Sequence, residues 1–445
     1  VTTLYGNTFH RNWQKLNKIT PSGGSSTNLS EALTSSGGLA VINGTAAGTL
    51  ELKNNNRGYY MYGLQSTLNH KLKKDGVEHN IEVGLRLHYD QIRRKQWEED
   101  FTQDANGNIT AVSVGARGSA GNKLQKTFAT TVHASDAMKF GKFTFTPGVR
   151  VETIRGEYCD DDASCGDDIM KQKRTYTVVV GGGSLKYDVY DSGGEDFDLF
   201  GGIYRGFSPA GPRANLKDGL EPETSIGFEL GARYKDAPKA LATEAVFFLT
   251  RIDDLIVNSS IGGSGSGNNV NAGKVQTLGL ELQANYDHGL HKGWVVQTPA
   301  YVAATYTNAI FMSSVGSTDT ESIFSGALHG NRVPYIPDLS LSFGMGAIYK
   351  KWSANLDANF VTSAYADGSN SSNIADTNDT ANERFGKIDS RIVVDATMGY
   401  QYSKKVRMFS SIKNLFNTEY MVSRQPHGPR PGAPLMVMGG LEFSL

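Results

Sequence analysis

Ile81-Glu82-Val83-Gly84-Leu85-Arg86-Leu87-His88-Tyr89-Asp90 alternates an apolar residue with a polar residue or glycine. Successive side chains of a β-strand point to opposite faces, so this stretch predicts a strand with one apolar and one polar face. The same alternation recurs in residues 226–235, 278–286, 339–349, 394–402 and 435–445. The repeated pattern predicts an all-β protein.

The length of these segments and of the links between them favours a membrane barrel. Several keep the alternation for about ten residues, which is what a tilted strand needs to cross a bilayer, whereas globular strands usually have about 5–6. Short and long links alternate along the chain. Short links include 73–76, 139–142 and 350–351, and long links include 17–56, 98–122, 156–173 and 308–337. Bacterial outer-membrane barrels have this asymmetry between their two ends. We therefore expect a transmembrane antiparallel β-barrel with about sixteen strands in this chain.

The composition and the absence of known motifs argue against several other classes of function. The 44 Lys and Arg nearly balance the 45 Asp and Glu, so no basic excess is available for nucleic acid. Motifs of nucleophilic hydrolases, nucleotide-binding loops and zinc proteases are absent from the sequence. The nine His are scattered. We expect no enzyme activity and no cofactor.

The C-terminal region carries a resemblance to a known family. Residues 412–420, Ile-Lys-Asn-Leu-Phe-Asn-Thr-Glu-Tyr, are similar to the barrel end of TonB-dependent outer-membrane receptors, as are residues 278–281 and 330–337. The resemblance implies a monomer in the bacterial outer membrane that is energised through the TonB protein. It also implies a plugged barrel of about 22 strands. Residues 1–445 would then be its C-terminal barrel part, with the N-terminal plug and first strands preceding Val1.

Three stretches, 9–16, 79–96 and 204–209, resemble the ferric citrate receptors within that family. This resemblance implies a receptor that imports ferric citrate, with the iron chelate as transported ligand. Two alternatives stay open. One is an unplugged sixteen-stranded diffusion porin, and the other is a TonB-dependent receptor for another siderophore, haem or cobalamin.

Arginines near the expected outer ends of strands are the candidate ligand-binding residues. A ferric citrate complex is a carboxylate-rich anion, and planar guanidinium groups bind carboxylates in a bidentate manner. The resemblance favours Arg93 and Arg94 among them, and Gln96 is expected to line the same wall. Pairing with acidic loop residues, or with lipopolysaccharide phosphates, is the alternative for each arginine. The full candidate set is Arg93, Arg94, Gln96, Arg155, Arg205, Arg213, Arg332, Arg424 and Arg430.

Cys159 and Cys165 lie in one expected extracellular loop, where an oxidising environment favours a disulfide. Carboxylates surround the two cysteines and offer hard oxygen ligands for calcium, but their spacing matches no ligand motif, which favours an acidic solvated loop. These carboxylates are Asp160, Asp161, Asp162, Asp167 and Asp168. Residues 104–108, Asp-Ala-Asn-Gly-Asn, lack the later ligands of a calcium loop and are expected to form a turn.

Overall fold

The computed structural model describes residues 1–160, 172–212, 219–258, 269–271, 273–315, 323–324, 326–374, 382–425 and 428–444. An 18-stranded antiparallel sheet dominates them. Two of its strands, β2 (Thr27–Asn28) and β5 (Ile109–Val114), are short additions at the extracellular end. The other sixteen each pair with the next one along the chain, as a simple meander. They are β1 (Thr2–Pro21), β3 (Gly48–Lys74), β4 (Val77–Gln103), β6 (Gly121–Phe140), β7 (Phe143–Asp160), β8 (Gln172–Ser192), β9 (Glu195–Ser208), β10 (Glu223–Asp236), β11 (Leu241–Asp253), β14 (Val275–Asp287), β15 (Pro299–Phe311), β16 (Leu339–Tyr349), β17 (Trp352–Val361), β20 (Arg391–Ser403), β21 (Val406–Lys413) and β24 (Met436–Phe443).

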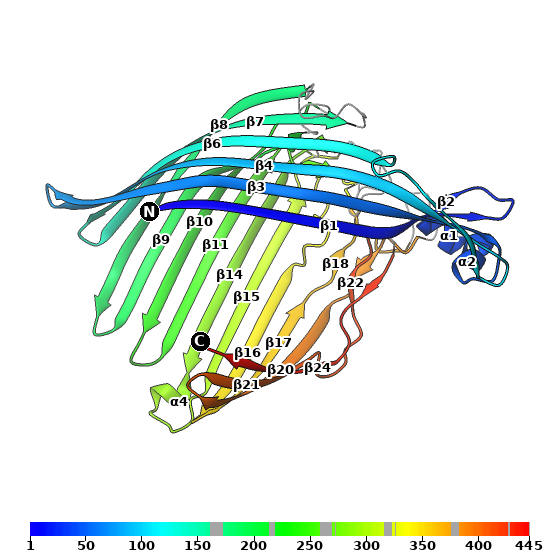
Figure 1. Cartoon of the computed structure of the whole chain (residues 1–445). Coiled ribbons are helices and arrows are strands. Elements are labelled where there is room, and N and C mark those ends of the chain that lie inside the picture. Colours follow the sequence, from blue (N-terminus) through cyan, green and yellow to red (C-terminus); the bar gives the residue numbers. More distant parts are fainter. Residues whose placement is uncertain are drawn as a thin grey trace.

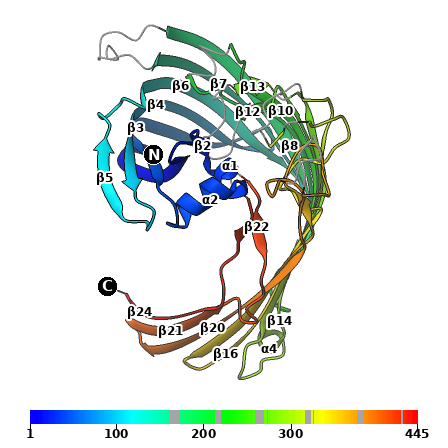
Figure 2. The same ribbon diagram turned by 90° about the vertical axis from the view of Figure 1, so that its right-hand side faces the viewer.

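The sheet curls into a barrel wall that is open on one side (Figures 1 and 2). β1 and β24 are its edge strands, and no ladder joins them within the described residues. In Figure 2 the chain ends lie on either side of the opening. The expected sixteen-strand meander is confirmed.

The two faces of the sheet differ in chemistry. Leu85, Val132, Val151 and Val179 pair in register across β4, β6, β7 and β8, and they are 41%, 49%, 39% and 54% exposed. A row of exposed aliphatic side chains suits contact with lipid, so this convex face is the outer face. Residues of the opposite parity, such as Arg86 and Glu152, are polar and face the lumen.

Tight turns close the periplasmic end of the barrel. Asp75 and Gly76 join β3 to β4 with φ values of 49° and 82°, and Gly193 and Gly194 join β8 to β9 with 66° and 88°. Such left-handed pairs are typical of two-residue hairpin turns. The link between β14 and β15 is longer and contains a single helical turn, α4 (His288–His291).

Several strands continue farther outward than expected. β1 runs to Pro21 and β3 starts at Gly48, where a link over 17–56 was expected, and β4 continues to Gln103 instead of ending near residue 98. Outside the membrane both faces of a strand meet water, so the apolar alternation disappears while the ladder continues. β3 and β4 reach 27 residues each and form a wall that rises above the lipid.

A small helical unit packs against the outer ends of β1, β3 and β4. It contains α1 (Leu29–Thr34), which begins at a capping box formed by Asn28 and Glu31, and α2 (Ser36–Ile42). Ile19, Ala32 and Val41 are its fully buried core. Among the described residues, none of the helices is long and apolar enough to pass through a membrane.

Short two-stranded ladders order the remaining described loops. They are β12 (Ile256–Asn258) with β13 (Asn269–Asn271), β18 (Ala364–Tyr365) with β19 (Lys387–Ile388), and β22 (Met421–Ser423) with β23 (Arg430–Pro431).

Candidate functional site

A row of basic residues crosses the lumen face near the outer end of the barrel. Arg11 of β1 pairs in register with Arg57 of β3, Arg57 with Arg94 of β4, and Arg94 with Lys123 of β6. Directly paired residues lie about 4.5–5.5 Å apart between Cα atoms and share one face of the sheet. Three guanidinium groups and one ammonium group are therefore presented side by side. We call these four residues the lumen basic row.

Two arginines of the lumen basic row have no acidic partner in the described part of the chain. The Nε of Arg57 is buried and has no hydrogen-bond acceptor there. Arg11 lies over the ring of Tyr59, with its guanidinium carbon 5.8 Å from the ring centroid. Neighbouring like charges repel one another, and a buried unpaired donor costs free energy. A bound anion would offset both costs.

Amide side chains buttress this row on its extracellular side. Gln96 and Asn55 follow Arg94 and precede Arg57 by two residues on the same face, and they are only 4% and 6% exposed. The Nε2 of Gln96 donates to the Oδ1 of Asn55, and the Nη2 of Arg94 donates to the Oε1 of Gln96 at 3.2 Å. The network holds the Arg94 guanidinium near Arg57. Gln96 thus lines the same wall as Arg94.

Arg93 lies on the opposite side of the sheet from Arg94. It pairs with Gly58 and Leu124, in positions that continue the outer-face parity of Leu85 and Leu87. Neighbouring residues of a strand point to opposite faces, so Arg93 and Arg94 do not form a pair over the lumen. Arg155 of β7 and Arg205 of β9 are on the outer face as well, because they follow the parity of Val151 and Ile203.

Other candidate arginines hold the extracellular loops together. Arg424, 6% exposed, donates from Nε to the Lys387 carbonyl at 2.9 Å and from Nη1 to the Glu383 carbonyl at 3.2 Å. Arg332 donates to Asn308 at 2.7 Å and to Asp338 at 3.1 Å. Both side chains are thus engaged by protein groups. Arg430 is exposed on β23, and Arg213 lies outside the described residues.

The cysteine region can be followed only in part. Cys159 is buried near the end of β7 and is disulfide-bonded. Asp160 is the last residue of β7. Cys165, Asp161, Asp162, Asp167 and Asp168 lie outside the described residues, and so does the expected calcium site. No cluster of three or more His, Cys, Asp or Glu side chains that could hold a metal ion occurs in the part of the chain that the structure describes.

Residues 104–108 form a turn, as expected. The Oδ1 of Asp104 accepts the backbone N–H groups of Asn106 at 2.8 Å and Asn108 at 2.9 Å. Hydrogen bonds from the Asn108 side chain, with those two backbone donors, lower the pKa of Asp104. The carboxylate is used within the turn itself.

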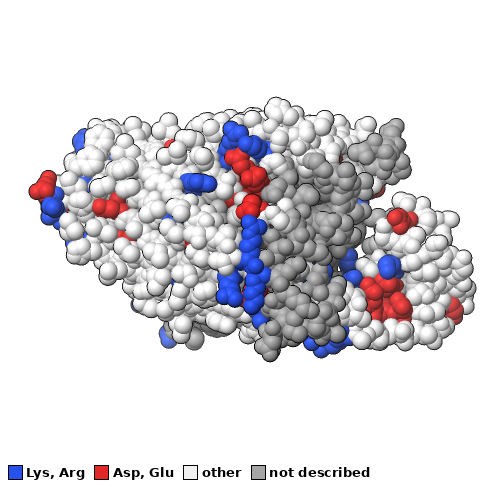
Figure 3. Space-filling model, turned by 90° about the horizontal axis from the view of Figure 1, so that it is seen from above, with Lys and Arg blue, Asp and Glu red and all other residues white. Residues whose placement is uncertain are grey.

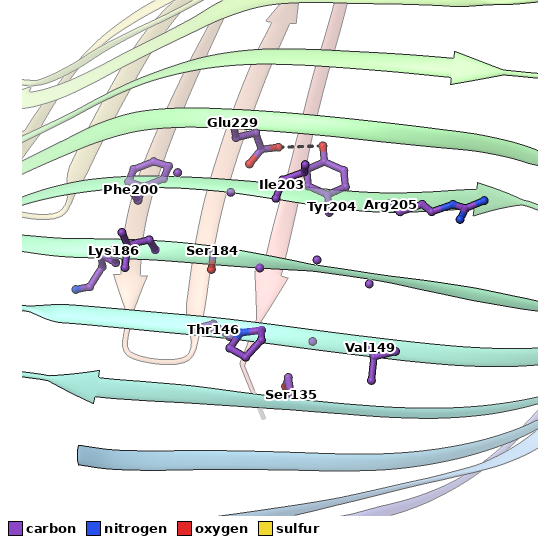
Figure 4. A pocket seen from close by; sticks show the side chains of 18 of the residues that line it. Ser135, Thr146, Val149, Ser184, Lys186, Phe200, Ile203, Tyr204, Arg205 and Glu229 are labelled. Carbon is purple, nitrogen blue, oxygen red and sulfur yellow. Dashed lines mark hydrogen bonds between the residues drawn. The ribbon is translucent and has the colours of Figure 1, made fainter. Parts of the chain in front are cut away.

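A hollow of about 830 Å³ occupies the wall from β6 to β10 (Figure 4). Gly148, Gly182 and Gly202 leave its floor without side chains, and a Cβ on Gly182 would lie 2.3 Å from the Ile203 carbonyl oxygen. In Figure 4 Tyr204 and Glu229 point toward each other, and the Tyr204 hydroxyl donates to Glu229 at 3.1 Å. Glu229 begins a set of lumen-facing carboxylates that continues with Glu244 and Glu281. Arg233 pairs with Glu244 at 2.5 Å, and Arg150 and Lys186 line the same hollow, so this part of the wall carries charges of both signs.

The sequence interpretation missed Arg11 and Arg57. Arg57 comes directly after residues 17–56, which were expected to be a loop. Its neighbours on β1 and β4 are known only once the register of these strands with β3 is known. The alternation of the strand puts Arg94 on the same face as Arg86 and His88. This signal could have shown from the sequence that Arg93 and Arg94 lie on opposite faces.

An open meander with a lipid-facing outer face, tight periplasmic turns and charged groups on its lumen face defines a membrane-barrel receptor wall. In a comparison with protein families, residues 2–415 match "TonB dependent receptor-like, beta-barrel". The chain belongs to this family of bacterial outer-membrane receptors, which are not enzymes. The family match sets aside the diffusion-porin alternative.

Individual relatives match parts of this wall. The pesticin receptor of Yersinia enterocolitica is 26% identical over 235 residues, which are 51% of this chain and 30% of that receptor. Among solved structures, the unliganded ferric citrate transporter FecA aligns with a TM-score of 0.67 and 22% identity, over 89% of this chain and 57% of that one. The Escherichia coli ferric-catecholate receptor Fiu has a TM-score of 0.67 and 14% identity, over 99% and 62%. The chain thus spans about a third of its curated relatives and less than two-thirds of these structures.

Proposed function

We propose that this chain is the ligand-capturing wall of a receptor that imports an anionic iron chelate, namely ferric citrate, with energy supplied through TonB. The observation that carries the proposal is the lumen basic row. Arg57, whose buried Nε has no hydrogen-bond acceptor in the described residues, and its neighbours Arg11 and Arg94 supply forked donors that match carboxylate oxygens. Iron is cargo in this proposal, and no covalent step is involved.

The charge distribution around the lumen supports an anion at this place. Glu229, Glu244 and Glu281 face the lumen from β10, β11 and β14, and the basic residue Arg233 on the same face is paired with Glu244 at 2.5 Å. The four adjacent cations of the lumen basic row would therefore draw an anionic chelate toward β1, β3 and β4. The resemblance of residues 9–16 and 79–96 to ferric citrate receptors falls on two of those three strands.

Binding of radiolabelled ferric citrate to the detergent-purified receptor tests the proposal. Arg57→Ala and Arg94→Ala should each lower the affinity by about tenfold or more, because each removes charge-assisted hydrogen bonds. Arg93→Ala, which removes the same charge from the adjacent residue on the outer face, is the matched control and should bind as the unaltered receptor does.

Competing ligands test the identity of the chelate. Excess iron-free citrate should compete weakly, while a ferric catecholate, a ferric hydroxamate and haem should leave ferric citrate binding intact. Equal affinity of Arg57→Ala, Arg94→Ala and the unaltered receptor for ferric citrate would contradict the proposed site. Tighter binding of one of the competing chelates would contradict the proposed ligand.

A further inference from the structure

One periplasmic link is longer than a barrel needs and carries a polar aromatic cluster. The convex wall of the barrel has few charges outside a narrow line of Lys and Arg (Figure 3). A separate cluster lies at the periplasmic end, where the chain passes from β14 to β15 (Figure 1). The turns at 75–76 and 193–194 take two residues, whereas this link covers residues 288–298 and contains α4. We call residues 286–298 the periplasmic histidine turn.

Two imidazole groups of this turn converge on one phenol. The Oη of Tyr286 lies 3.0 Å from the Nδ1 of His288 and 2.8 Å from the Nδ1 of His291. Each imidazole ring stands steeply to the Tyr286 ring, at 64° and 74°, with both centroid distances 5.9 Å. All three side chains are half-buried at the periplasmic end of the wall. Solutes of the periplasm can therefore reach them.

The three polar atoms form a set of lone pairs with few hydrogens among them. A phenol has a single hydrogen, so Tyr286 donates to one Nδ1 only, and the other Nδ1 must donate to Oη. A neutral imidazole carries one hydrogen, on either of its two ring nitrogens. When both rings carry it on Nε2, two nitrogen lone pairs and the phenol oxygen are directed at the same space. Such a set suits a cation.

The turn is held in place by its own hydrogen bonds. The Oδ1 of Asp287 accepts the backbone N–H groups of Leu290 and Thr298, both at 2.8 Å. A Cβ on Gly289 would overlap the Val296 carbonyl oxygen, so the two arms of the turn are in close contact. Ligands that are already positioned bind an ion without a further cost of ordering.

We propose that Tyr286, His288 and His291 bind a divalent transition-metal ion, and that Cu²⁺ is bound most tightly. Imidazole nitrogens suit copper, nickel and zinc, and the affinity of such a site is highest for Cu²⁺. With bonds of about 2.0–2.2 Å, ligands at right angles lie about 2.8–3.1 Å apart. The Oη of Tyr286 has this separation from each Nδ1.

Metal binding requires one proton to leave the site. The phenol proton of Tyr286 passes to water, and the imidazole that carried its hydrogen on Nδ1 carries it on Nε2 instead. Two Nδ1 lone pairs and the phenolate oxygen then bind the ion, because ligand atoms must be deprotonated. Water fills the remaining coordination positions.

The metal site is distinct from the lumen basic row in place and in chemistry. Tyr286 follows the outer-face parity of Leu280 and Leu282, and it lies at the opposite end of the barrel. The site combines two histidines with a phenol, so it differs from clusters of three or more His, Cys, Asp or Glu, which the described residues lack. The inference therefore holds whichever chelate is transported.

Titration of Cu²⁺ into the untagged receptor, purified in detergent and a non-coordinating buffer, tests the proposal. The unaltered receptor should bind one Cu²⁺ tightly. The double variant His288→Gln, His291→Gln should bind it at least about a hundredfold more weakly, because both nitrogen ligands are lost. The matched control His70→Gln, His329→Gln removes two exposed histidines elsewhere and should bind as the unaltered receptor does.

Two spectroscopic signals report where the ion binds. A bond between Cu²⁺ and a phenolate absorbs visible light, and Tyr286→Phe should lose this band together with about tenfold in affinity. His288 stands edge-on to Trp294, with ring centroids 4.7 Å apart. Bound Cu²⁺ should therefore quench the fluorescence of Trp294. Most of the quenching should disappear in Trp294→Phe, while the affinity is retained.

Two results would overturn the proposal. One is equal Cu²⁺ affinity of the double histidine variant and the unaltered receptor, and the other is an unchanged affinity and absorption spectrum of Tyr286→Phe. Heat-modifiable migration on gels verifies that each variant is a folded barrel. Should the double variant not fold, His291→Gln alone, measured in the same way, decides between the same outcomes. Ferric citrate affinity should be unchanged in every variant, so the metal site and the proposed function are tested separately.

Discussion

The two faces of the wall formed by β1, β3, β4 and β6 carry similar charges in different surroundings. On the lumen face Arg57 and Arg94 lie in one register row beside buried amides, while on the outer face Arg93 and Lys126 border the lipid-facing surface. The adjacent residues 93 and 94 therefore face opposite sides of the wall. The parity of a residue decides which face its side chain occupies, and its position along the strand decides at what height.

The largest expected effect comes from removing two arginines from the lumen face. The double variant Arg57→Ala, Arg94→Ala should lower ferric citrate affinity by about 10²–10³-fold, since two sets of charge-assisted hydrogen bonds are lost. Equilibrium binding in detergent measures it. Heat-modifiable migration of the same protein on gels, as for the unaltered receptor, shows that the barrel is intact. A loss of this migration together with the loss of affinity would instead indicate a misfolded wall.

Moving one charge from face to face sharpens the comparison. Arg94→Gln with Gln91→Arg keeps the charge of β4 but moves one cation from the lumen face to the outer face. We expect about a tenfold loss of ferric citrate affinity, because guanidinium groups bind carboxylates only within reach. Isothermal titration with ferric citrate measures it. Full chelate affinity would show that overall charge, and not parity, governs capture.

The glycine floor of the hollow depends on backbone contact. Gly182→Ala should destabilise the barrel by about 1–3 kcal/mol, because the new Cβ would overlap the Ile203 carbonyl of the neighbouring strand. Gly183→Ala is the control, since its Cβ would meet the Phe145 ring at an ordinary 3.4 Å. Urea unfolding in lipid vesicles, followed by tryptophan fluorescence, compares the two. Equal midpoints would contradict the predicted clash.

Arg424 belongs to neither face, and its loss should act on the extracellular loops. Arg424→Ala leaves the carbonyls of Lys387 and Glu383 without this donor, at a cost of about 1–3 kcal/mol. Faster proteolysis of residues 382–431 at unchanged ferric citrate affinity is the expected outcome. A large loss of ferric citrate affinity, with the loops still resistant to proteolysis, would indicate that Arg424 binds the ligand.

The smallest effect concerns Glu157 on the outer face of β7. Glu157→Gln frees Arg155 and Lys173 from their shared partner. Exposed ion pairs contribute about 0–1 kcal/mol, so the free energy of unfolding should hardly change. Urea unfolding in lipid vesicles measures the difference. A clearly larger loss of stability would mean that Glu157 holds β7 and β8 together.

Much of the fold could be predicted because lipid imposes a pattern on strands. Between Ile81 and Tyr89 one face meets hydrocarbon, so the alternation is readable, and turns such as 73–76 carry their own signal. The outer halves of β3 and β4 could not be predicted in the same way. Residues 48–54 lie in a ladder beyond the lipid, where Leu50 packs against α1 and α2, and the alternation of Leu50 and Leu52 is too short to mark a strand.

Only those residues of the candidate site that local sequence and strand alternation identify could be predicted. Arg94 and Gln96 were proposed through resemblance, and a hydrogen bond between their side chains places them on one wall, while their role in ligand binding stays a prediction. Arg57 depends on the pairing of strands about 40 residues apart, which no single segment encodes. The loop contacts of Arg332 and Arg424 likewise depend on tertiary packing.

The 27-residue length of β3 and β4 has a consequence for the rate of capture. The lumen basic row lies on the part of these strands that has already left the hydrocarbon, so its field extends into water above the cell surface. At physiological ionic strength that field reaches about 8 Å, and at tenfold lower salt it reaches about three times as far. Dilution of the medium should therefore speed encounter with a multivalent anion while the rate of release changes little. A bacterium in fresh water would collect such an anion faster than one in brine.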